Sequence, residues 1–335
     1  MKKKNKAIYL LFLMPFVYFA TACFVVWLVK TSGIYPSGSD TMYHVYRGDY
    51  VYNAIKSGNL YPLYDPAWYN GVEILRYWSP FPAYVMAFCQ YLAGGSQFGA
   101  YLFYIGGVCF LGACVWPFIG RGFNRPYLGA FIGLLWFFMP NNLCAIFIEG
   151  NLARSLSMIF LPVFIYSVYK YLYNHKLRYI PLMVFTFLLM ELCHLGYAGM
   201  VAIAVIIYGI VYMIQKGRKK AVLDVVISMI FGFMLLGIWL VASLRGGITS
   251  LDNSENMANF FQNLWITINP FERLTRGFEY FYFGFAALVV IVFGILFGYK
   301  KSRTGFVTGF IILLMTTKSA YAVLKHLPGA SIYGC

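Results

Sequence analysis

The chain of 335 residues is 61% hydrophobic and 11% charged, with a mean hydropathy of +0.69. A soluble domain carries about 25% charged residues, so this chain has too few to cover its surface with polar groups, which excludes a soluble protein. The formal charge of +15 could suggest nucleic-acid binding, but the basic residues are spread between apolar segments. The composition therefore predicts a multi-pass membrane protein with no nucleic-acid partner.

The N-terminus, "MKKKNK", is followed by an apolar run from Ala7 to Val29. The apolar core of a signal peptide has about 7–15 residues and precedes a cleavage site between small residues. This run is longer and lacks such a site, so it predicts a first transmembrane helix that remains attached.

A spanning helix needs about 20 mostly apolar residues. The remaining candidates complete a set of about nine spans and predict an all-α, polytopic helix bundle that forms a single transmembrane domain over residues 1–335. The predicted spans are 7–29, 98–119, 126–147, 154–173, 179–195, 197–214, 221–243, 280–298 and 304–323.

Charge between the spans predicts their orientation, because Lys and Arg accumulate in cytoplasmic loops. With a cytoplasmic N-terminus, the inner side holds 16 basic residues and one acid, whereas the outer side holds 10 basic and 10 acidic residues. This asymmetry accounts for the net charge. Together with the retained basic N-terminus, it predicts a multi-pass protein of a bacterial plasma membrane.

Residues 80–93 are apolar but too short to span a bilayer, and counting them as a span would place Arg121 and Arg125 outside. We therefore expect this segment to lie flat on the outer surface or to be re-entrant. It belongs to a large first outer loop, 30–97, which carries short surface helices. A second outer loop is predicted over 244–279.

The stretch "GSDTMYHVYRGDY" places three ionisable side chains at i, i+4 and i+7, namely Asp40, His44 and Arg47. If a helix begins at Asp40, the three share one face, whereas Asp49 lies on another. A functional site is one interpretation. The alternative is an acid that complements the helix dipole, followed by a solvated loop.

Further polar residues fall on the same side of the predicted membrane. Glu149 and Arg154 lie between the third and fourth spans, and Glu191 and His194 lie near the outer end of the fifth. Ionisable groups in a span are costly, which favours a functional role. A surface ion pair and a hydrogen bond within the bundle are the alternatives. Arg245 is either an interfacial anchor or a phosphate ligand.

Several catalytic signatures are absent from the sequence. It contains no GxxxxGK[ST] phosphate loop, no HExxH, no CxxC and no GxSxG. The seven cysteines lie mostly within apolar runs and are interpreted as small hydrophobic residues. ATP hydrolysis and zinc-dependent proteolysis are therefore unsupported.

A first span followed by a large outer loop that opens with an acid resembles the GT-C superfamily of membrane glycosyltransferases. The blocks "GSDTMYHVYR", "SGNLYPLYDPAWYNGVEILRYWSPFPAYV", "EGNLARSLSMIFLPVFIY" and "MELCHLG" are similar to bacterial multi-pass proteins called 6-pyruvoyl-tetrahydropterin-synthase-related membrane proteins. Such relatives continue for hundreds of residues more, so the chain is expected to be a shortened form. Many GT-C enzymes carry two adjacent acids in this loop, but here Ser39 precedes Asp40.

The resemblance implies transfer of a sugar from a polyprenyl-phosphate donor to an envelope glycan or lipid acceptor, with inversion. Asp40 would act as general base and His44 would orient it or share its proton. The predicted substrate-binding residues are Arg47, Asp49, Glu149, Arg154, His194, Arg245, Tyr69 and Trp78.

No metal ligands are assigned, although the superfamily leaves room for a divalent metal ion between Asp40 and Glu149. The aromatic residues have an alternative role as an interfacial belt. A lipid-linked glycan flippase or transporter and a non-catalytic scaffold of envelope polysaccharide assembly are the alternative functions.

Overall fold

The computed structural model describes residues 2–36, 38–68, 70–245 and 285–315, with a few single positions between 317 and 326. Its Cα positions divide the chain into two compact units, which are described separately. The first unit comprises residues 1–198 and 228–246, and the second comprises 199–227 and 247–335. The prediction of a single transmembrane domain stays a prediction.

Helices account for the regular structure of the described residues. The first unit holds α1 (Lys2–Ser32), α2 (Thr41–Lys56), α3 (Ile74–Tyr77), α4 (Phe81–Leu92), α5 (Gln97–Gly122), α6 (Pro126–Trp136), α7 (Pro140–Leu143), the π-helix η1 (Cys144–Ile148), α8 (Leu152–Asn174), α9 (Tyr179–Cys193) and α12 (Gly237–Leu244). The described residues form no strand, and Asp65 and Val72 pair only as an isolated bridge. The predicted all-α class is confirmed for this part of the chain.

Four helices are long and apolar enough to cross a membrane: residues 12–32 of α1, then α5, α8 and α10 (Leu195–Lys216). Two bent pairs raise the number to six, namely α6 with the segment Asn141–Ile148, and α11 (Lys219–Leu235) with α12. Helix α9 and the segment Ser302–Met315 are apolar but shorter. The structure therefore supports four to six candidate spans, and the count of nine stays a prediction.

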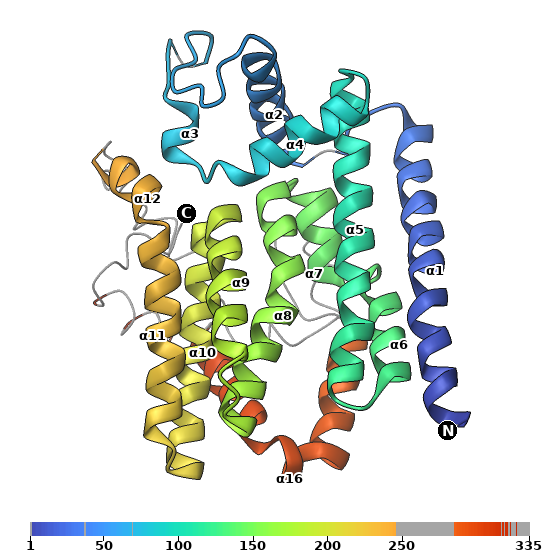
Figure 1. Cartoon of the computed structure of the whole chain (residues 1–335), viewed down its shortest axis with the longest axis vertical. Helices are drawn as coiled ribbons and strands as arrows, with labels where there is room; N and C mark the ends of the chain where they lie inside the picture. The colour runs from blue at the N-terminus through green and yellow to red at the C-terminus, as the bar shows by residue number, and fades with distance from the viewer. Residues whose placement is uncertain are drawn as a thin grey trace. The chain divides into compact units, whose positions relative to one another are not determined.

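Within the first unit, α2, α3 and α4 gather at one end of α5 and α8, and α4 runs across these helices rather than along them (Figure 1). Only a short turn, which contains Gly94 and Gly95, separates α4 from α5. The placement of residues 80–93 on a membrane surface stays a prediction. The predicted sidedness is a separate matter and stays a prediction.

Helix α1 packs on α5 and α6 through Tyr18, which is fully buried and donates from its hydroxyl to the carbonyl of Ala130 at 2.8 Å. A buried phenol finds such a partner because an unsatisfied hydroxyl is costly in an apolar environment. The other side of α1 exposes large apolar side chains, including Phe12, Phe16 and Phe24. This apolar surface is suited to contact with lipid.

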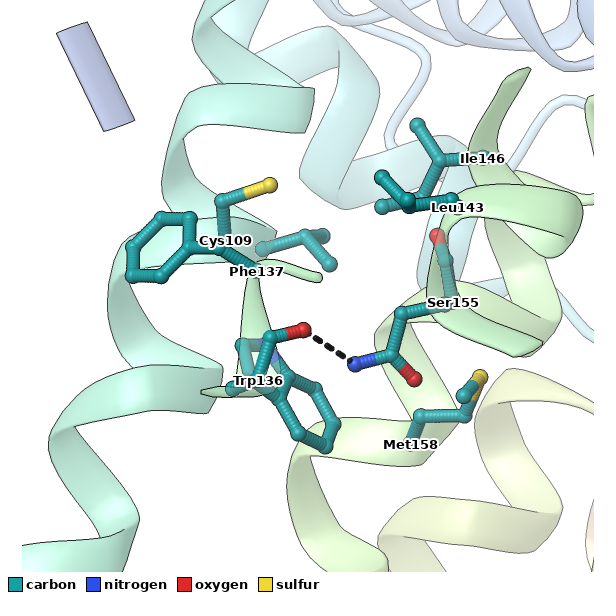
Figure 2. Close-up of a pocket in the computed structure, with 9 residues that line it drawn as sticks. Cys109, Trp136, Phe137, Leu143, Ile146, Ser155 and Met158 are labelled. Atoms are coloured by element: carbon teal, nitrogen blue, oxygen red, sulfur yellow. Dashed lines mark hydrogen bonds between the residues drawn. The ribbon is translucent and has the colours of Figure 1, made fainter. Parts of the chain in front are cut away.

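The predicted span 126–147 is not one straight helix. It bends by 41° between α6 and the following segment, because Pro140 interrupts the backbone hydrogen bonding. Asn142 compensates by donating from Nδ2 to the free carbonyl of Trp136 at 2.8 Å. Figure 2 shows this bond beside a small, mostly apolar cavity between Cys109 and Ser155, with room for about one water molecule.

The opposite end of α5 and α8 is basic. Lys170 donates to the carbonyl of Gly122 at 2.6 Å, and its ammonium lies 4.4 Å from the ring centre of Phe123. A cation near a helix C-terminus satisfies free carbonyls and complements the helix dipole.

In the second unit, α16 (Phe285–Met315) is kinked at Ser302, where φ is −117°. Thr304 of α16 donates to Gln215 Oε1 of α10 at 2.7 Å. Most of the predicted loop 244–279 lies outside the described residues, which end at Arg245 and resume at Phe285.

Candidate functional site

The start of α2 is joined to a segment more than 100 residues away. The backbone N–H of Asp40 donates to the carbonyl of Glu149 at 3.0 Å, and Ser39 Oγ donates to the same carbonyl at 3.0 Å. Asp40 occupies the N-cap position of α2, but its carboxylate makes no capping hydrogen bond to the helix. Its Oδ1 instead accepts from Ser39 Oγ at 3.2 Å, and the residue is half-buried. The Asp40 carboxylate oxygens therefore accept no hydrogen bond from the first-turn N–H groups of α2.

Two glycines allow this close approach. A Cβ on Gly38 would lie 2.5 Å from the Cα of Gly150, and a Cβ on Gly150 would lie 2.6 Å from the backbone N of Thr41. Gly150 also has a φ of +67°, a conformation that side chains disfavour. The sequence therefore needs glycine at both positions to bring Asp40 against Glu149.

The π-helix η1 positions the Glu149 side chain. The N–H of Glu149 donates to the carbonyl of Cys144 at 2.9 Å, five residues back, so η1 ends at the site. Glu149 Oε2 lies 2.7 Å from Arg154 Nη2 in an ion pair whose side chains are 19% and 20% exposed. In the described part of the chain, neither Nε nor Nη2 of Arg154 makes a hydrogen bond, so the contact is electrostatic.

His44 and Arg47 lie on the buried face of α2. Arg47 Nη2 lies 3.3 Å from His44 Nδ1, and because guanidinium only donates, the imidazole accepts. Arg47 Nε donates to the carbonyl of Tyr43 at 3.2 Å. Burial lowers the pKa of His44 well below its usual 6.5, and the positive charge of Arg47 and the neighbouring His194 act in the same direction. His44 is therefore neutral at pH 7.

Burial also lowers the pKa of Arg47 to about 10, and the negative charge of Asp40 opposes that shift. Arg47 is therefore charged at pH 7. Its guanidinium lies 5.0 Å from the ring centre of Trp78, the residue that directly follows α3. A cation over an indole face is attracted by the ring's quadrupole, so Trp78 stabilises this buried charge.

Two residues that cap helix N-termini, Asn151 and His194, lie close together. Asn151 Oδ1 accepts from the N–H of Arg154 at 2.9 Å and caps α8. His194 Nδ1 accepts from the N–H of Tyr197 at 3.0 Å, in the first turn of α10. The other nitrogens of the two caps, Asn151 Nδ2 and His194 Nε2, lie 3.3 Å apart.

The structure thus brings six of the predicted residues into one group. Asp40 lies within electrostatic range of Arg47 and His194, and Arg154 lies within range of His194. The backbone and side-chain contacts above connect the others. We call this group the polar cluster: Asp40, His44, Arg47, Glu149, Arg154 and His194.

The other predicted residues lie elsewhere or contact the cluster only from its edge. Trp78 covers Arg47, whereas Asp49 accepts from Gln90 Nε2 of α4 at 2.6 Å, on a different face of α2. Arg245 is exposed at the end of α12. Tyr69 lies outside the described residues.

Sequence reasoning missed two contributors. Asn151 precedes α8 and caps it, a role that its position before an apolar helix in "EGNLARS" could have indicated. Tyr104 of α5 is buried and donates to the carbonyl of Leu152 at 2.8 Å, beside the cluster. No local pattern distinguishes Tyr104 from the other aromatic residues of a spanning helix.

The described residues do not fit a metal site at this position. They contain no group of three or more His, Cys, Asp or Glu side chains placed to hold a metal ion. The Glu149 carboxylate is already paired with Arg154, which competes with a cation for its oxygens. The interpretation of a divalent ion between Asp40 and Glu149 therefore gains no support.

Comparisons with known proteins give a family. The model of the 6-pyruvoyl-tetrahydropterin synthase related domain, described as a membrane protein, matches residues 75–333. An uncharacterized protein of Lactococcus lactis subsp. cremoris (strain MG1363) is 20% identical over 323 residues, which cover 88% of this chain and 50% of that relative. The chain therefore spans about half the length of this relative.

No solved structure matches the chain. The family match covers more than half of the chain and most of its apolar helices, and it agrees with the four to six candidate spans. The chain belongs to the 6-pyruvoyl-tetrahydropterin synthase related family of membrane proteins.

Proposed function

We propose that the polar cluster is the active site of a membrane glycosyltransferase that uses a polyprenyl-phosphate sugar as donor. One observation carries the proposal: a carboxylate that does not cap its own helix, Asp40, lies within electrostatic range of the Arg47 guanidinium, and the same cluster holds a second guanidinium, that of Arg154. A base beside cationic groups is the combination that transfer from a phosphate leaving group needs.

In the proposed reaction, the hydroxyl oxygen of the acceptor attacks the anomeric carbon of the donor sugar. The hydroxyl proton moves to the Asp40 carboxylate as the new carbon–oxygen bond forms. The bond from the anomeric carbon to the phosphate oxygen breaks, and the phosphate leaves with the electron pair. The configuration inverts, and no strong acid is needed because the leaving group is a phosphate.

The charged residues have separate roles in this proposal. Arg47 and Arg154 offset the negative charge that grows on the departing phosphate, since guanidinium is suited to phosphate oxygens. His44, which is neutral and accepts from Arg47, holds that guanidinium in place instead of sharing the proton of Asp40. Asp49, Arg245 and Tyr69 remain candidate substrate-binding residues away from the reacting atoms, and Trp78 is a candidate for stacking on the sugar.

The same proposal includes the membrane topology of the chain and the class of acceptor. The chain would cross a bacterial plasma membrane about nine times with its N-terminus in the cytoplasm, and the cluster would face the outer surface. The acceptor would be an envelope glycan or lipid. Because the chain covers half of its Lactococcus relative, the transfer assay should include a longer form wherever the gene continues.

The test is a transfer assay. Purified protein is given radiolabelled polyprenyl-phosphate sugars, with an extract of envelope lipids as acceptor. We expect transfer by the wild type and a loss of at least 100-fold in Asp40→Asn, which keeps the backbone bond to Glu149. Asp224→Asn, the same change in α11 at a residue outside the polar cluster and the candidate substrate-binding residues, serves as control and should retain transfer.

Equal transfer by Asp40→Asn and the wild type would refute the assignment of the base. Donor binding without transfer by the longest form would favour a lipid-linked glycan flippase or transporter. Neither binding nor transfer would favour a scaffold, for which the Glu149–Arg154 and Arg47–Trp78 contacts would serve stability alone.

A further inference from the structure

The two N-caps at the polar cluster present a mismatch in hydrogen bonding. His194 Nδ1 accepts from the N–H of Tyr197, so this nitrogen carries no proton. A neutral imidazole has one N–H, which must then be on Nε2. Asn151 Oδ1 accepts from the N–H of Arg154, so its other atom is the Nδ2 amide, which only donates.

Two donors therefore face each other. Asn151 Nδ2 and His194 Nε2 lie 3.3 Å apart, and neither can accept from the other. Each is held in place by its capping bond, so neither side chain can turn without exposing a helix N–H. An acceptor that contacts both nitrogens would satisfy them.

The surroundings of this gap provide further donors and positive charge. Arg154 lies within electrostatic range of His194, and its Nε is buried without a hydrogen bond in the described residues. Helix α8 is 23 residues long and directs its positive N-terminal end to the gap. Thr41, which is 1% exposed, has an Oγ1 without a hydrogen-bond partner in the described part and packs against Gly150, next to Asn151.

We propose that an oxygen of a phosphate group binds between Asn151 Nδ2 and His194 Nε2, with Arg154 beside it. A phosphate oxygen accepts several hydrogen bonds, carries negative charge and donates none when ionised, which matches a gap lined by donors. The inference rests on the proposed function in one respect: the phosphate of the sugar donor would occupy this place. The geometry also suits the phosphate of a membrane phospholipid or free phosphate.

The test measures binding to the full chain in neutral detergent with ³²P-labelled farnesyl phosphate, a prenyl phosphate. Asn151→Asp keeps the capping oxygen and the size of the side chain but removes the donor and adds negative charge. We expect it to weaken binding at least tenfold. Asn59→Asp is the matched control, because Asn59 is exposed and its Oδ1 also accepts from a backbone N–H, that of Tyr61, at 3.2 Å.

Two further variants guard against misfolding. Asn151→Ser and His194→Ser keep a capping oxygen without adding charge, and each should also weaken binding several-fold. Farnesol, which lacks the phosphate, should not compete. Failure of the wild type to bind farnesyl phosphate or inorganic phosphate would overturn the proposal, as would equal affinity in Asn151→Asp, Asn151→Ser and Asn59→Asp.

The competitors distinguish the sources of the phosphate. Because unlabelled farnesyl phosphate must compete with its labelled form, the other two competitors decide. Competition by neither phosphatidylglycerol vesicles nor inorganic phosphate supports a prenyl phosphate, competition by the vesicles supports a phospholipid, and competition by inorganic phosphate without the vesicles supports a free anion. Each of these outcomes supports the site. Phosphate binding without sugar transfer would support the phosphate site and refute the proposed glycosyltransferase activity. Sugar transfer together with unaltered binding in Asn151→Asp would support the activity and refute the phosphate site.

Discussion

Gly38 and Gly150 meet backbone to backbone: a Cβ on Gly38 would lie 2.5 Å from the Cα of Gly150. This contact joins the first outer loop to the connection that leads into α8. The hydrogen bond from Asp40 to Glu149 lies directly beside it. The distance between Asp40 and the residues that follow Glu149 therefore depends on two positions with no side chain.

We expect Gly150→Ala to separate the start of α2 from α8. The added Cβ would lie 2.6 Å from the backbone N of Thr41, in a left-handed backbone conformation, and together these should cost about 2–4 kcal/mol of unfolding free energy. Gly94→Ala is the matched control, since Gly94 has a φ of +66° but nothing within 4 Å of an added Cβ. Thermal unfolding in detergent measures both; equal losses would show that the contact is unimportant.

Stability should fall in acid because of His44. Its folded pKa lies well below 6.5, chiefly through burial and then through Arg47 and His194, so below pH 6.5 the unfolded chain binds a proton that the native chain does not. The unfolding free energy should therefore decrease as pH drops below 6.5, by at most about 1.4 kcal/mol per pH unit, and should not change from this cause above 6.5.

His44→Asn tests this expectation. The Asn Oδ1 can take the place of Nδ1 and accept from Arg47, but it does not titrate. Melting temperatures measured between pH 7.5 and 5 should fall more steeply for the wild type than for the variant. Parallel curves would contradict the assignment of a buried, neutral His44.

The Arg47–Trp78 contact should be measurable as a coupling energy. Its geometry, a guanidinium 5.0 Å from an indole centre with Arg47 nearly buried, predicts about 0.5–2 kcal/mol. A double-mutant cycle with Arg47→Gln and Trp78→Ala measures it from unfolding free energies. If the two changes add within about 0.3 kcal/mol, the ring does not stabilise the charge.

The sidedness of α4 can be tested by cysteine labelling. Tyr91 of α4 and Leu177, in the connection between α8 and α9, are similarly exposed, at 71% and 72%. A membrane-impermeant maleimide should label Tyr91→Cys in intact cells and Leu177→Cys only after permeabilisation. Labelling of Tyr91→Cys from the cytoplasmic side alone would refute the surface placement.

Much of the site could be predicted because helical spacing is local. Asp40, His44 and Arg47 were expected on one face of a helix that begins at Asp40, and α2 begins at Thr41. Hydropathy similarly predicted α5, α8 and α10 to within a few residues. These features depend on short stretches of chain that can be read directly.

The burial of the polar cluster could not be predicted from the sequence, because it depends on contacts between distant segments. Spacing does not indicate that His44 and Arg47 are nearly buried or that Asn151 and His194 cap neighbouring helices. The bend after α6 was also missed, since hydropathy averages over Pro140 although proline in a helix interior signals a break.

Because residues 144–148 form the π-helix η1, the number of residues in this segment determines how its two ends are oriented relative to each other. One turn there contains an extra residue relative to an α-helix, so deleting a single residue would restore the ordinary repeat. The residues on one side would then rotate by about 100° relative to the other. An insertion or deletion in this segment would therefore turn Glu149 away from Arg154 and realign the connection that leads into α8.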